Sequence, residues 1–388
     1  MTWRQCRLGD VLTLKRGHDL PGDARKEGEI PVVSSSGITG YHSEAKAQPP
    51  GVVTGRYGTL GEVFYLEEPY WPLNTALYVV DFKGTHPKFA CYFLRDVLRD
   101  YQSDKAAVPG VDRNVLHEMS VRVPDPSIQA EIAGLLSAYD DLLENNARRI
   151  RLLEDSARLL YEEWFIRLRF SGHEHTRITQ SPLGPIPQGW RIVRLGDITS
   201  KIGSGATPRG GSSAYHEAGV ALIRSLNVYD YSFMDEGLVF LNDEQAEDLS
   251  NVSVAARDIL LNITGASVAR CCMVPDRHLP ARVNQHVMII RIDPALADPY
   301  FVFCALNNEG RKRQLLSYAQ KGATREALTR EMMLAFEIVL PEARLLRQFS
   351  EVAAPVFQQR EVLSHQSAKL RQARDLLLPR LMNGEIAV

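Results

Sequence analysis

Apolar residues recur at alternating spacings of four and three over two long stretches of this chain, with polar residues between them. Asp125 and Pro126 suit the N-cap and first turn of a helix. The stripe that follows runs through Ile128, Ile132, Leu135, Tyr139 and Leu142, is interrupted at Asn146, and resumes at Ile150, Leu153, Ala157, Leu160 and Trp164. This spacing predicts a helix with a coiled-coil seam. Over residues 127–168 the helix would be about 63 Å long.

A second stripe of the same kind lies near the end of the sequence. It runs through Leu345, Phe349, Val352, Val356, Leu363, Leu370, Ala373 and Leu377. Pro355 lies inside this stripe and predicts a kink or break, because proline has no N–H to donate within a helix. Neither helix can bury its stripe alone, so we expect the two to pair as an antiparallel coiled coil.

The rest of the chain also reads as a repeat. "WRQCRLGDV" opens at Trp3 and "WRIVRLGDI" opens at Trp190. Asn74 in "PLNTALYVVDF" corresponds by pattern to Asn284 in "RVNQHVMIIRI", and each precedes an alternating apolar run typical of a strand. "VPGVDRNVL" (108–116) corresponds to "QKGATREAL" (320–328), and strands ending in proline follow at 119–126 and 335–342. The pattern therefore predicts one globular unit written twice, each copy followed by a long helix.

The predicted fold class is α+β, with two similar mixed α/β domains separated by the two helices and related by a pseudo-twofold internal repeat. We place the first domain at 1–126, its helix at 127–170, a polar Pro/Gly-rich linker at 171–189, the second domain at 190–341 and the last helix at 342–388. A duplicated structural protein with no ligand fits the same pattern.

Composition changes this picture little. The chain of 388 residues is 45% hydrophobic and 24% charged, and its net charge is −2, so a DNA-binding role requires basic groups concentrated on one face. The cysteines are odd in number and lack C-x-x-C spacing, which suits a reducing compartment: Cys6, Cys91, Cys271, Cys272 and Cys304. With no apolar run long enough to span a bilayer and no signal-like N-terminus, we expect a cytoplasmic protein that contacts no membrane.

No catalytic or metal motif stands out, so we expect no catalytic residue and no enzyme activity from this chain alone. "EEPY" (67–70) lacks the leading amide or acid and the tandem proline of an adenine methyltransferase tetrapeptide, and reads as a turn. "GSGATPRGGSS" (203–213) lacks the Gly-Lys-Ser/Thr end of a phosphate loop. "HEH" (173–175) reads as polar linker, and a zinc site at Cys271, Cys272 and His278 would need a fourth ligand that we do not find.

Polar glycine-bounded loops suited to DNA are more plentiful. Arginine reads guanine, amide side chains read adenine, and hydroxyls hold phosphates. For any one of these residues a structural turn is an equal alternative. The predicted DNA contacts are Ser34, Ser35, Ser36, Arg56, Tyr57, Asn74 and Arg113 in the first copy, and Thr207, Ser225, Asn227, Thr264, Ser267, Asn284, Gln285, Lys321, Thr324 and Arg325 in the second.

Taken together, "LLYEEWFIRLRFSGHE" (159–174), "GPIPQGWRIVRLGDI" (184–198), "GSGATP" (203–208) and "LLLPRLMNGEI" (376–386) resemble the specificity subunits of type I restriction–modification systems. The second copy matches the family pattern at Gly205, Thr207, Pro208, Asn284, Gly322 and Thr324. The first copy departs from it, since "LKRGHDLP" (14–21) lacks the Gly-Ser/Ala-Thr-Pro form and "PGVDRNVL" lacks the usual threonine.

The resemblance implies a non-catalytic DNA-binding subunit with two target recognition domains, each reading one half of a bipartite site. The family's two long conserved helices would set the spacing and dock two modification subunits. This chain would bind no cofactor, while partner subunits would carry S-adenosylmethionine for adenine-N6 methylation and ATP with Mg²⁺ for translocation and cleavage by restriction subunits. Three alternatives stay open: a methyltransferase or nuclease with an unrecognised active site, a coiled-coil protein adaptor, and a recognition subunit from another type of restriction enzyme.

Overall fold

The computed structural model describes residues 3–56, 61–99, 110–321 and 327–388. The chain folds into two compact units. Unit 1 is Met1–Ala147 together with His365–Val388, and unit 2 is Arg148–Ser364. Each of the two long helices therefore contributes one part to each unit.

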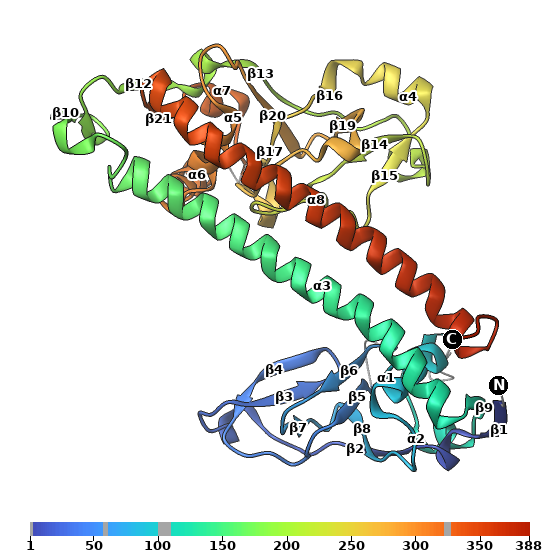
Figure 1. Cartoon of the computed structure of the whole chain (residues 1–388). Coiled ribbons are helices and arrows are strands. Elements are labelled where there is room, and N and C mark those ends of the chain that lie inside the picture. Colours follow the sequence, from blue (N-terminus) through green and yellow to red (C-terminus); the bar gives the residue numbers. More distant parts are fainter. Residues whose placement is uncertain (1–2, 57–60, 100–109, 322–326) are drawn as a thin grey trace. The chain divides into compact units, whose positions relative to one another are not determined.

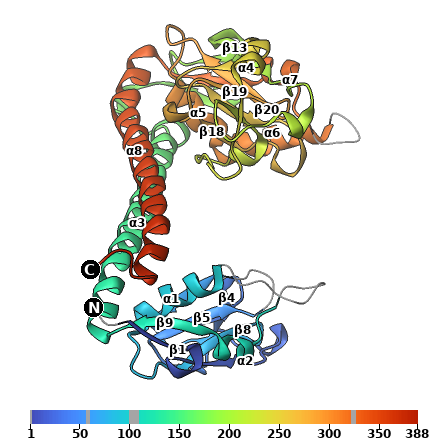
Figure 2. The ribbon, with the colours of Figure 1, turned by 90° about the vertical axis from the view of Figure 1, so that its right-hand side faces the viewer.

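In its described residues, unit 1 has three small antiparallel or mixed sheets and, besides its parts of the long helices, two short α-helices. One sheet pairs β1 (Trp3–Arg7) with β9 (Ser120–Pro124), and a four-stranded sheet has the order β2 (Thr13–Arg16), β8 (Ala76–Asp81), β5 (Gly51–Gly55), β6 (Val63–Leu66). A third has the order β4 (Gly37–His42), β3 (Ile30–Ser34), β7 (Trp71–Pro72), with β3 and β7 parallel. Helix α1 (Pro87–Arg99) packs on β5 and β6, and α2 (Arg113–Glu118) precedes β9 (Figure 2).

Unit 2 repeats this plan. β12 (Arg191–Arg194) pairs with β21 (Glu337–Leu340), and the four-stranded sheet has the order β13 (Thr199–Ser204), β20 (Val287–Ile292), β17 (Ile259–Asn262), β18 (Cys271–Met273). The other sheet has the order β15 (Val239–Leu241), β14 (Val220–Ile223), β19 (Ala281–Val283), β16 (Ser253–Val254), with β14 and β19 parallel. The helices are α4 (Asp243–Asp248), α5 (Pro299–Asn307), α6 (Glu309–Lys321) and α7 (Arg330–Leu334). The strand order in unit 2 is the order in unit 1, except that β16 is an added edge strand beside β19, and this shared order confirms the predicted internal repeat.

The segment predicted to be a polar linker, 171–189, contains a short hairpin. Its strands are β10 (Ile178–Ser181) and β11 (Gly184–Pro187), paired antiparallel in a two-stranded sheet of their own. Gly184 has a φ of +100°, which glycine adopts without strain at such a turn.

The two long helices are α3 (Pro126–Tyr161), which ends in a π-helical turn at Glu162–Ile166, and α8 (Ala343–Met382) (Figure 1). Within unit 1, Asp140 of α3 pairs with Arg374 of α8 at 2.6 Å, and within unit 2, Glu154 pairs with Arg360 at 2.8 Å. The partner numbers fall on α8 as they rise on α3, so the helices are antiparallel, as predicted. The expected break at Pro355 is wrong, because α8 is continuous through it. Pro355 and Glu351 both face solvent, where the Glu351 carbonyl, which receives no N–H from the proline, is open to water.

The predicted seam of α3 is partly wrong. Leu135 and Leu142 are exposed, while their neighbours Leu136 and Leu143 are buried, and Asn146 is buried in the seam that it was expected to interrupt. The observed seam is one unbroken series: Ile132, Leu136, Tyr139, Leu143, Asn146, Ile150, Leu153, Ala157 and Leu160. Both leucines of each pair fit a spacing of three or four, so these two positions of the first stripe, Leu135 and Leu142, were each placed one residue too early.

The other predicted helix positions fare better, with one exception. Val352 is exposed, and the adjacent Ala353 is buried in its place. Buried as predicted are Ile132, Phe349 and Leu363; half-buried are Ile128, Tyr139, Ile150, Leu153, Leu160, Val356, Leu370 and Leu377.

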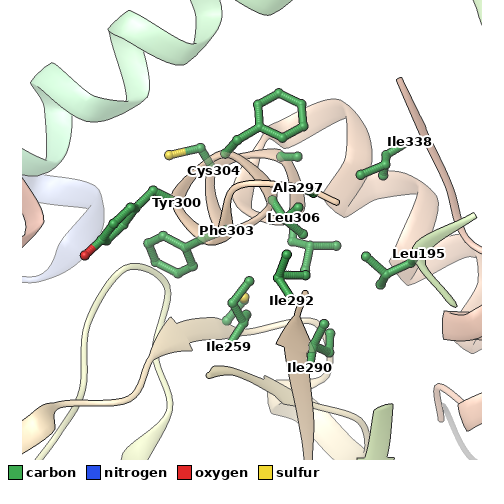
Figure 3. Close-up of a cluster of buried hydrophobic side chains, with 14 of the residues drawn as sticks. Leu195, Ile259, Ile290, Ile292, Ala297, Tyr300, Phe303, Cys304, Leu306 and Ile338 are labelled. Carbon is green, nitrogen blue, oxygen red and sulfur yellow. The ribbon is translucent and has the colours of Figure 1, made fainter. Parts of the chain in front are cut away.

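Each unit has its own core. In unit 1, Leu8, Phe89 and Phe93 are buried with Ile132 of α3 and Leu381 of α8. In unit 2 the strand residues Ile259, Ile290 and Ile292 face the apolar side of α5 (Figure 3). Among the described residues, no helix is both long and apolar enough to cross a membrane.

The resembling motifs take their places in these cores. Tyr161, Phe165 and Phe170 of "LLYEEWFIRLRFSGHE" are buried in the core of unit 2. In "LLLPRLMNGEI", Gly384 lies against the ring of Trp3 in unit 1, where a Cβ would come within 2.9 Å of the indole. These segments are therefore packing elements at the ends of the long helices.

Candidate nucleic-acid interface

Both units place a glycine directly after the first strand of the four-stranded sheet. The N–H of Gly17 donates to the carbonyl of Ala76, and the N–H of Gly205 donates to the carbonyl of Val287, both at 3.0 Å. A Cβ at Gly17 would overlap the carbonyl oxygen of Leu73, and a Cβ at Gly205 would overlap that of Val283. Only glycine fits at this point, so the first copy keeps the structural glycine of the second although the surrounding sequence differs.

A polar side chain lies two residues after each glycine: Asp19 in unit 1 and Thr207 in unit 2. Each forms a hydrogen bond with an amide side chain in the turn before the neighbouring strand of the sheet, which is β8 in unit 1 and β20 in unit 2. Asn74 Nδ2 donates to Asp19, and Thr207 Oγ1 donates to Gln285 Oε1. The two units thus hold different polar groups on the same backbone scaffold. Asp19 and Gln285 are exposed, and Asn74 is half-buried.

The structural counterpart of Asn74 is therefore Gln285, and the predicted correspondence with Asn284 is wrong by one residue. Asn284 is only 7% exposed, and its Oδ1 accepts the backbone N–H of His286 at 3.1 Å. Its backbone N–H donates to Ile223, as that of Leu73 donates to Val33 in unit 1. Asn284 consequently stabilises the turn and is corrected from a DNA contact to a structural residue.

In unit 1 three arginines line one hollow beside this edge, which we call the basic hollow. It has a volume of about 330 Å³ and is lined by Arg16, Arg56, Leu77, Gly110, Val111, Asp112, Arg113 and Asn114. Arg16 also pairs with Asp19 at 3.5 Å, which joins the hollow to the Asp19–Asn74 pair. With three guanidinium groups and one carboxylate in its lining, the basic hollow is suited to bind an anion such as a phosphate, or a guanine base.

A histidine next to Gly17 adds no charge to this edge at neutral pH. Burial, with help from Lys15 and Lys46, lowers the pKa of His18. Its Nε2 lies 3.2 Å from the hydroxyl of Tyr78. The arginines thus supply the positive charge around the hollow.

Unit 2 has a chain of hydrogen-bonded polar groups at the same edge. Thr264 Oγ1 lies 2.7 Å from Nδ1 of His286, and Gln285 Nε2 lies 3.1 Å from Nε2 of the same ring. Thr207 in turn donates to Gln285. The network around the His286 ring therefore links three of the residues predicted as DNA contacts, Thr207, Thr264 and Gln285. Such a network fixes the orientation of the amide, which is the group that reads adenine.

The short helix after this edge corrects a second predicted correspondence. Val111 donates to the carbonyl of Arg56 in unit 1, and Leu328 donates to that of Ile263 in unit 2, so the counterpart of Arg113 is Arg330. The match of 108–116 with 320–328 is therefore wrong by five residues. Arg330 is exposed, but its Nε is engaged in the fold, since it donates to the carbonyl of Ile202 at 2.8 Å.

Other predicted contacts have structural duties. Ser34, 7% exposed, ends β3 directly before Ser35 and Ser36 of the β3–β4 turn, and its hydroxyl donates to the carbonyl of Gly37. Asn227 is fully buried, accepts the N–H of Arg224 and donates to two carbonyls of the loop at 234–236. Ser34 and Asn227 are thus corrected to turn-forming residues.

The remaining predicted contacts stay predictions. Ser225 and Ser267 are half-buried in turns, and Ser36 is exposed. Tyr57, Thr324 and Arg325, with Gly322 and the side chain of Lys321, lie outside the described residues.

Sequence reasoning missed Arg16, Asp19 and His286, which join the predicted residues into clusters. The available signal was the position of Gly17, which aligns with Gly205 when the strands are counted from the two WR…RLGD motifs. Counting onward from these glycines pairs Asp19 with Thr207.

Comparisons with known proteins agree with the fold. Residues 1–155 match the family described as the type I restriction modification DNA specificity domain. The type I restriction enzyme MjaIX specificity subunit of Methanocaldococcus jannaschii is 28% identical over 301 residues, 76% of this chain and 66% of that protein. The HindI specificity subunit of Haemophilus influenzae is 21% identical over 340 residues, 74% of this chain and 73% of that protein. The crystal structure of the type I S subunit from M. genitalium covers 98% of this chain and 96% of its own, with a TM-score of 0.66 at 15% identity, which shows a shared fold.

Proposed function

The chain belongs to the specificity subunits of type I restriction–modification systems, and we propose that each of its units reads one half of a bipartite DNA site. The comparisons support DNA recognition and give no support to a methyltransferase, a nuclease or a protein-only adaptor.

One observation carries the proposal for two separate half-sites. The same edge of the same fold presents guanidinium and carboxamide groups in unit 1, and hydroxyl, carboxamide and imidazole groups in unit 2. Arginine favours guanine and amides favour adenine in the major groove. Equivalent scaffolds with different chemistry are what one polypeptide needs to read two different sequences.

The helices would serve as the spacer between half-sites and as docking surfaces. Leu135 and Leu142 of α3 and Val352 of α8 are exposed apolar residues, which suits contact with modification subunits. In this scheme the partners are double-stranded DNA, two modification subunits with S-adenosylmethionine, and restriction subunits with ATP and Mg²⁺. This chain itself would contribute recognition in the cytoplasm and no cofactor.

Mapping of methylated adenine tests the proposal. A methylation-free host would express this chain with its modification subunit, and a second culture would express the modification subunit alone. We expect a split motif only when this chain is present. Absence of new methylation, with the complex assembled and soluble, would contradict the proposal and favour an adaptor.

A further inference from the structure

Unit 1 has a second hollow, of about 680 Å³, between the loop after β6 and one face of α3. Its floor includes Phe64 and Leu66, and the exposed Ile38 stands at its side. We call it the acidic hollow. Its apolar floor and charged walls resemble a site for a protein segment more than a site for solvent alone.

The walls carry five carboxylates against two cations: Glu67, Glu68, Asp140, Asp141 and Glu144 against Lys88 and Arg95. Some of these charges are already matched inside unit 1. Lys88 pairs with Glu67 at 3.3 Å, and Asp140 accepts from Tyr92 and pairs with Arg374, both at 2.6 Å.

Glu68, Asp141 and Glu144 make no ion pair within the ranges that the structure describes. The excess negative charge repels phosphate, so DNA does not suit this hollow. A positively charged side chain does.

Unit 2 shows what fills the equivalent place. Pro124, the last residue of β9, corresponds to Pro341, the residue directly after β21. The helices then run without insertion, so Glu361 of α8 corresponds to Glu144 of α3. Glu361 pairs with Arg277, which also forks onto Asp235 at 2.8 Å. Arg277 is only 15% exposed, so its guanidinium is held between two carboxylates in a largely closed site.

The arginine comes from a loop that is shorter in unit 1. The loop between β18 and β19 holds seven residues (274–280), including Arg277, whereas the loop between β6 and β7 holds four (67–70), including Glu67 and Glu68. Unit 1 thus presents acids from the loop toward acids on the helix, where unit 2 supplies an arginine.

Aromatic packing closes the unit 2 site further. Tyr300 stacks on Phe357 with ring centroids 5.4 Å apart. Their counterparts in unit 1 are Lys88 and Asp140, which leave the hollow open. In unit 2 the place beside the long helix is therefore occupied by the unit's own Arg277, whereas in unit 1 the equivalent place is the open acidic hollow.

We propose that the acidic hollow receives an arginine-bearing segment of a modification subunit, with its guanidinium between Glu68 and Glu144 as Arg277 lies between Asp235 and Glu361. This rests on the proposed function, because it takes the modification subunit as the partner. Unit 2 already contains its own arginine, so only one of the two docked modification subunits makes this contact. The two halves of the complex are then held with different strength.

The test is a charge reversal, Glu68→Lys with Glu144→Lys, in the full chain titrated with purified modification subunit. Native mass spectrometry counts the subunits bound, and biolayer interferometry gives the affinities. We expect one of the two binding events to weaken about tenfold or more, because like charges would face each other across the hollow, while the other stays unchanged. Glu29→Lys, an exposed glutamate of unit 1 outside the hollow, is the matched control and should leave both events unchanged.

A photo-crosslinking residue at Ser137, on the α3 wall of the hollow, gives a readout that does not depend on how the reversed variant folds. The expected product joins Ser137 to a modification-subunit peptide containing arginine. Crosslinks to DNA, or to no subunit in the assembled complex, would overturn the inference.

The outcomes separate this inference from the proposed function. If the wild-type chain binds two modification subunits and directs methylation, and the reversed variant binds both equally well, the hollow is not a docking site and the function stands. If the wild-type chain binds no modification subunit, both the proposed function and the occupant named here are wrong.

Discussion

Truncation of one leucine in α3 should cost far more than truncation of its neighbour. Leu143 is 9% exposed in the seam, whereas Leu142 is 51% exposed on the outer face. A buried leucine replaced by alanine typically costs 2–5 kcal/mol, and a seam position with some exposure belongs near the lower end, about 2–3 kcal/mol. A surface leucine costs about 0.5 kcal/mol. Leu143→Ala should therefore lower the free energy of unfolding of unit 1 by about 2 kcal/mol more than Leu142→Ala.

Hydrogen-exchange mass spectrometry on α1 peptides in the core of unit 1 reads out this difference without assuming that the whole chain unfolds in one step. Calorimetry should show the corresponding transition of the Leu143→Ala variant lower by about 4–8 °C, at 2–4 °C per kcal/mol. Equal costs for the two variants, or a larger cost for Leu142→Ala, would refute the observed phase of the seam. Leu142→Asp should instead weaken binding of the modification subunit while leaving exchange in unit 1 unchanged.

Gly205→Ala should destabilise unit 2 by about 1–3 kcal/mol in urea unfolding, because a Cβ at this position overlaps the backbone of Val283. A Cβ at Gly203 meets nothing within 4 Å, so Gly203→Ala should cost less than about 1 kcal/mol. Equal losses of stability would contradict the close approach at Gly205. Arg113→Ala should weaken binding to one half-site and lower the slope of log K against log[salt] by about 1, measured by fluorescence anisotropy, and an unchanged slope would remove Arg113 from the phosphate contacts. Burial first, then Lys83 and Arg113, lowers the pKa of His117 below its usual 6.5, and His117 Nε2 accepts the N–H of Leu14 at 3.0 Å. Its contribution to stability is complete above pH 6.5 and declines as the pH falls from there toward the lowered pKa, since the unfolded state takes up the proton first. Between pH 7.5 and pH 5.5 the unfolding temperature should therefore fall less in the His117→Gln variant than in the wild-type chain. An equal fall in both would exclude His117 as the cause.

The predicted fold held where it rested on long periodic patterns and on repeated motifs. Both copies begin with the strand that WR…RLGD marks and end with the strand before the helix. The phase of α3 failed because Leu135–Leu136 and Leu142–Leu143 each offer two solutions. Extending the second part of the stripe backward from Ile150 in steps of four and three leads through Asn146 to the observed seam. The error came from treating a polar residue as an interruption, although a buried asparagine is a familiar seam residue in coiled coils.

The candidate site was less predictable, because polar residues in loops serve turns and ligands with the same chemistry. Asn227 and Gln285 are both amides in loops, and only the structure shows that the first is fully buried while the second is exposed. Arg16 is the last residue of β2 and belongs to no sequence motif. Arg113 is far from it in the sequence, yet the fold brings both arginines to the lining of the basic hollow. Such convergence depends on strand register, which local sequence does not encode.

Opposite charges at separate places in unit 1 explain how a chain with a net charge of −2 can serve DNA binding. Three arginines gather at the basic hollow, while carboxylates gather at the acidic hollow beside α3. Their sum nearly cancels, but the field near each is set by the charges within a Debye length, about 8 Å at physiological ionic strength. DNA and a basic protein segment can therefore be directed to different surfaces of one small unit. The near-neutral total then favours specific docking over the non-specific binding that a uniformly basic surface would give.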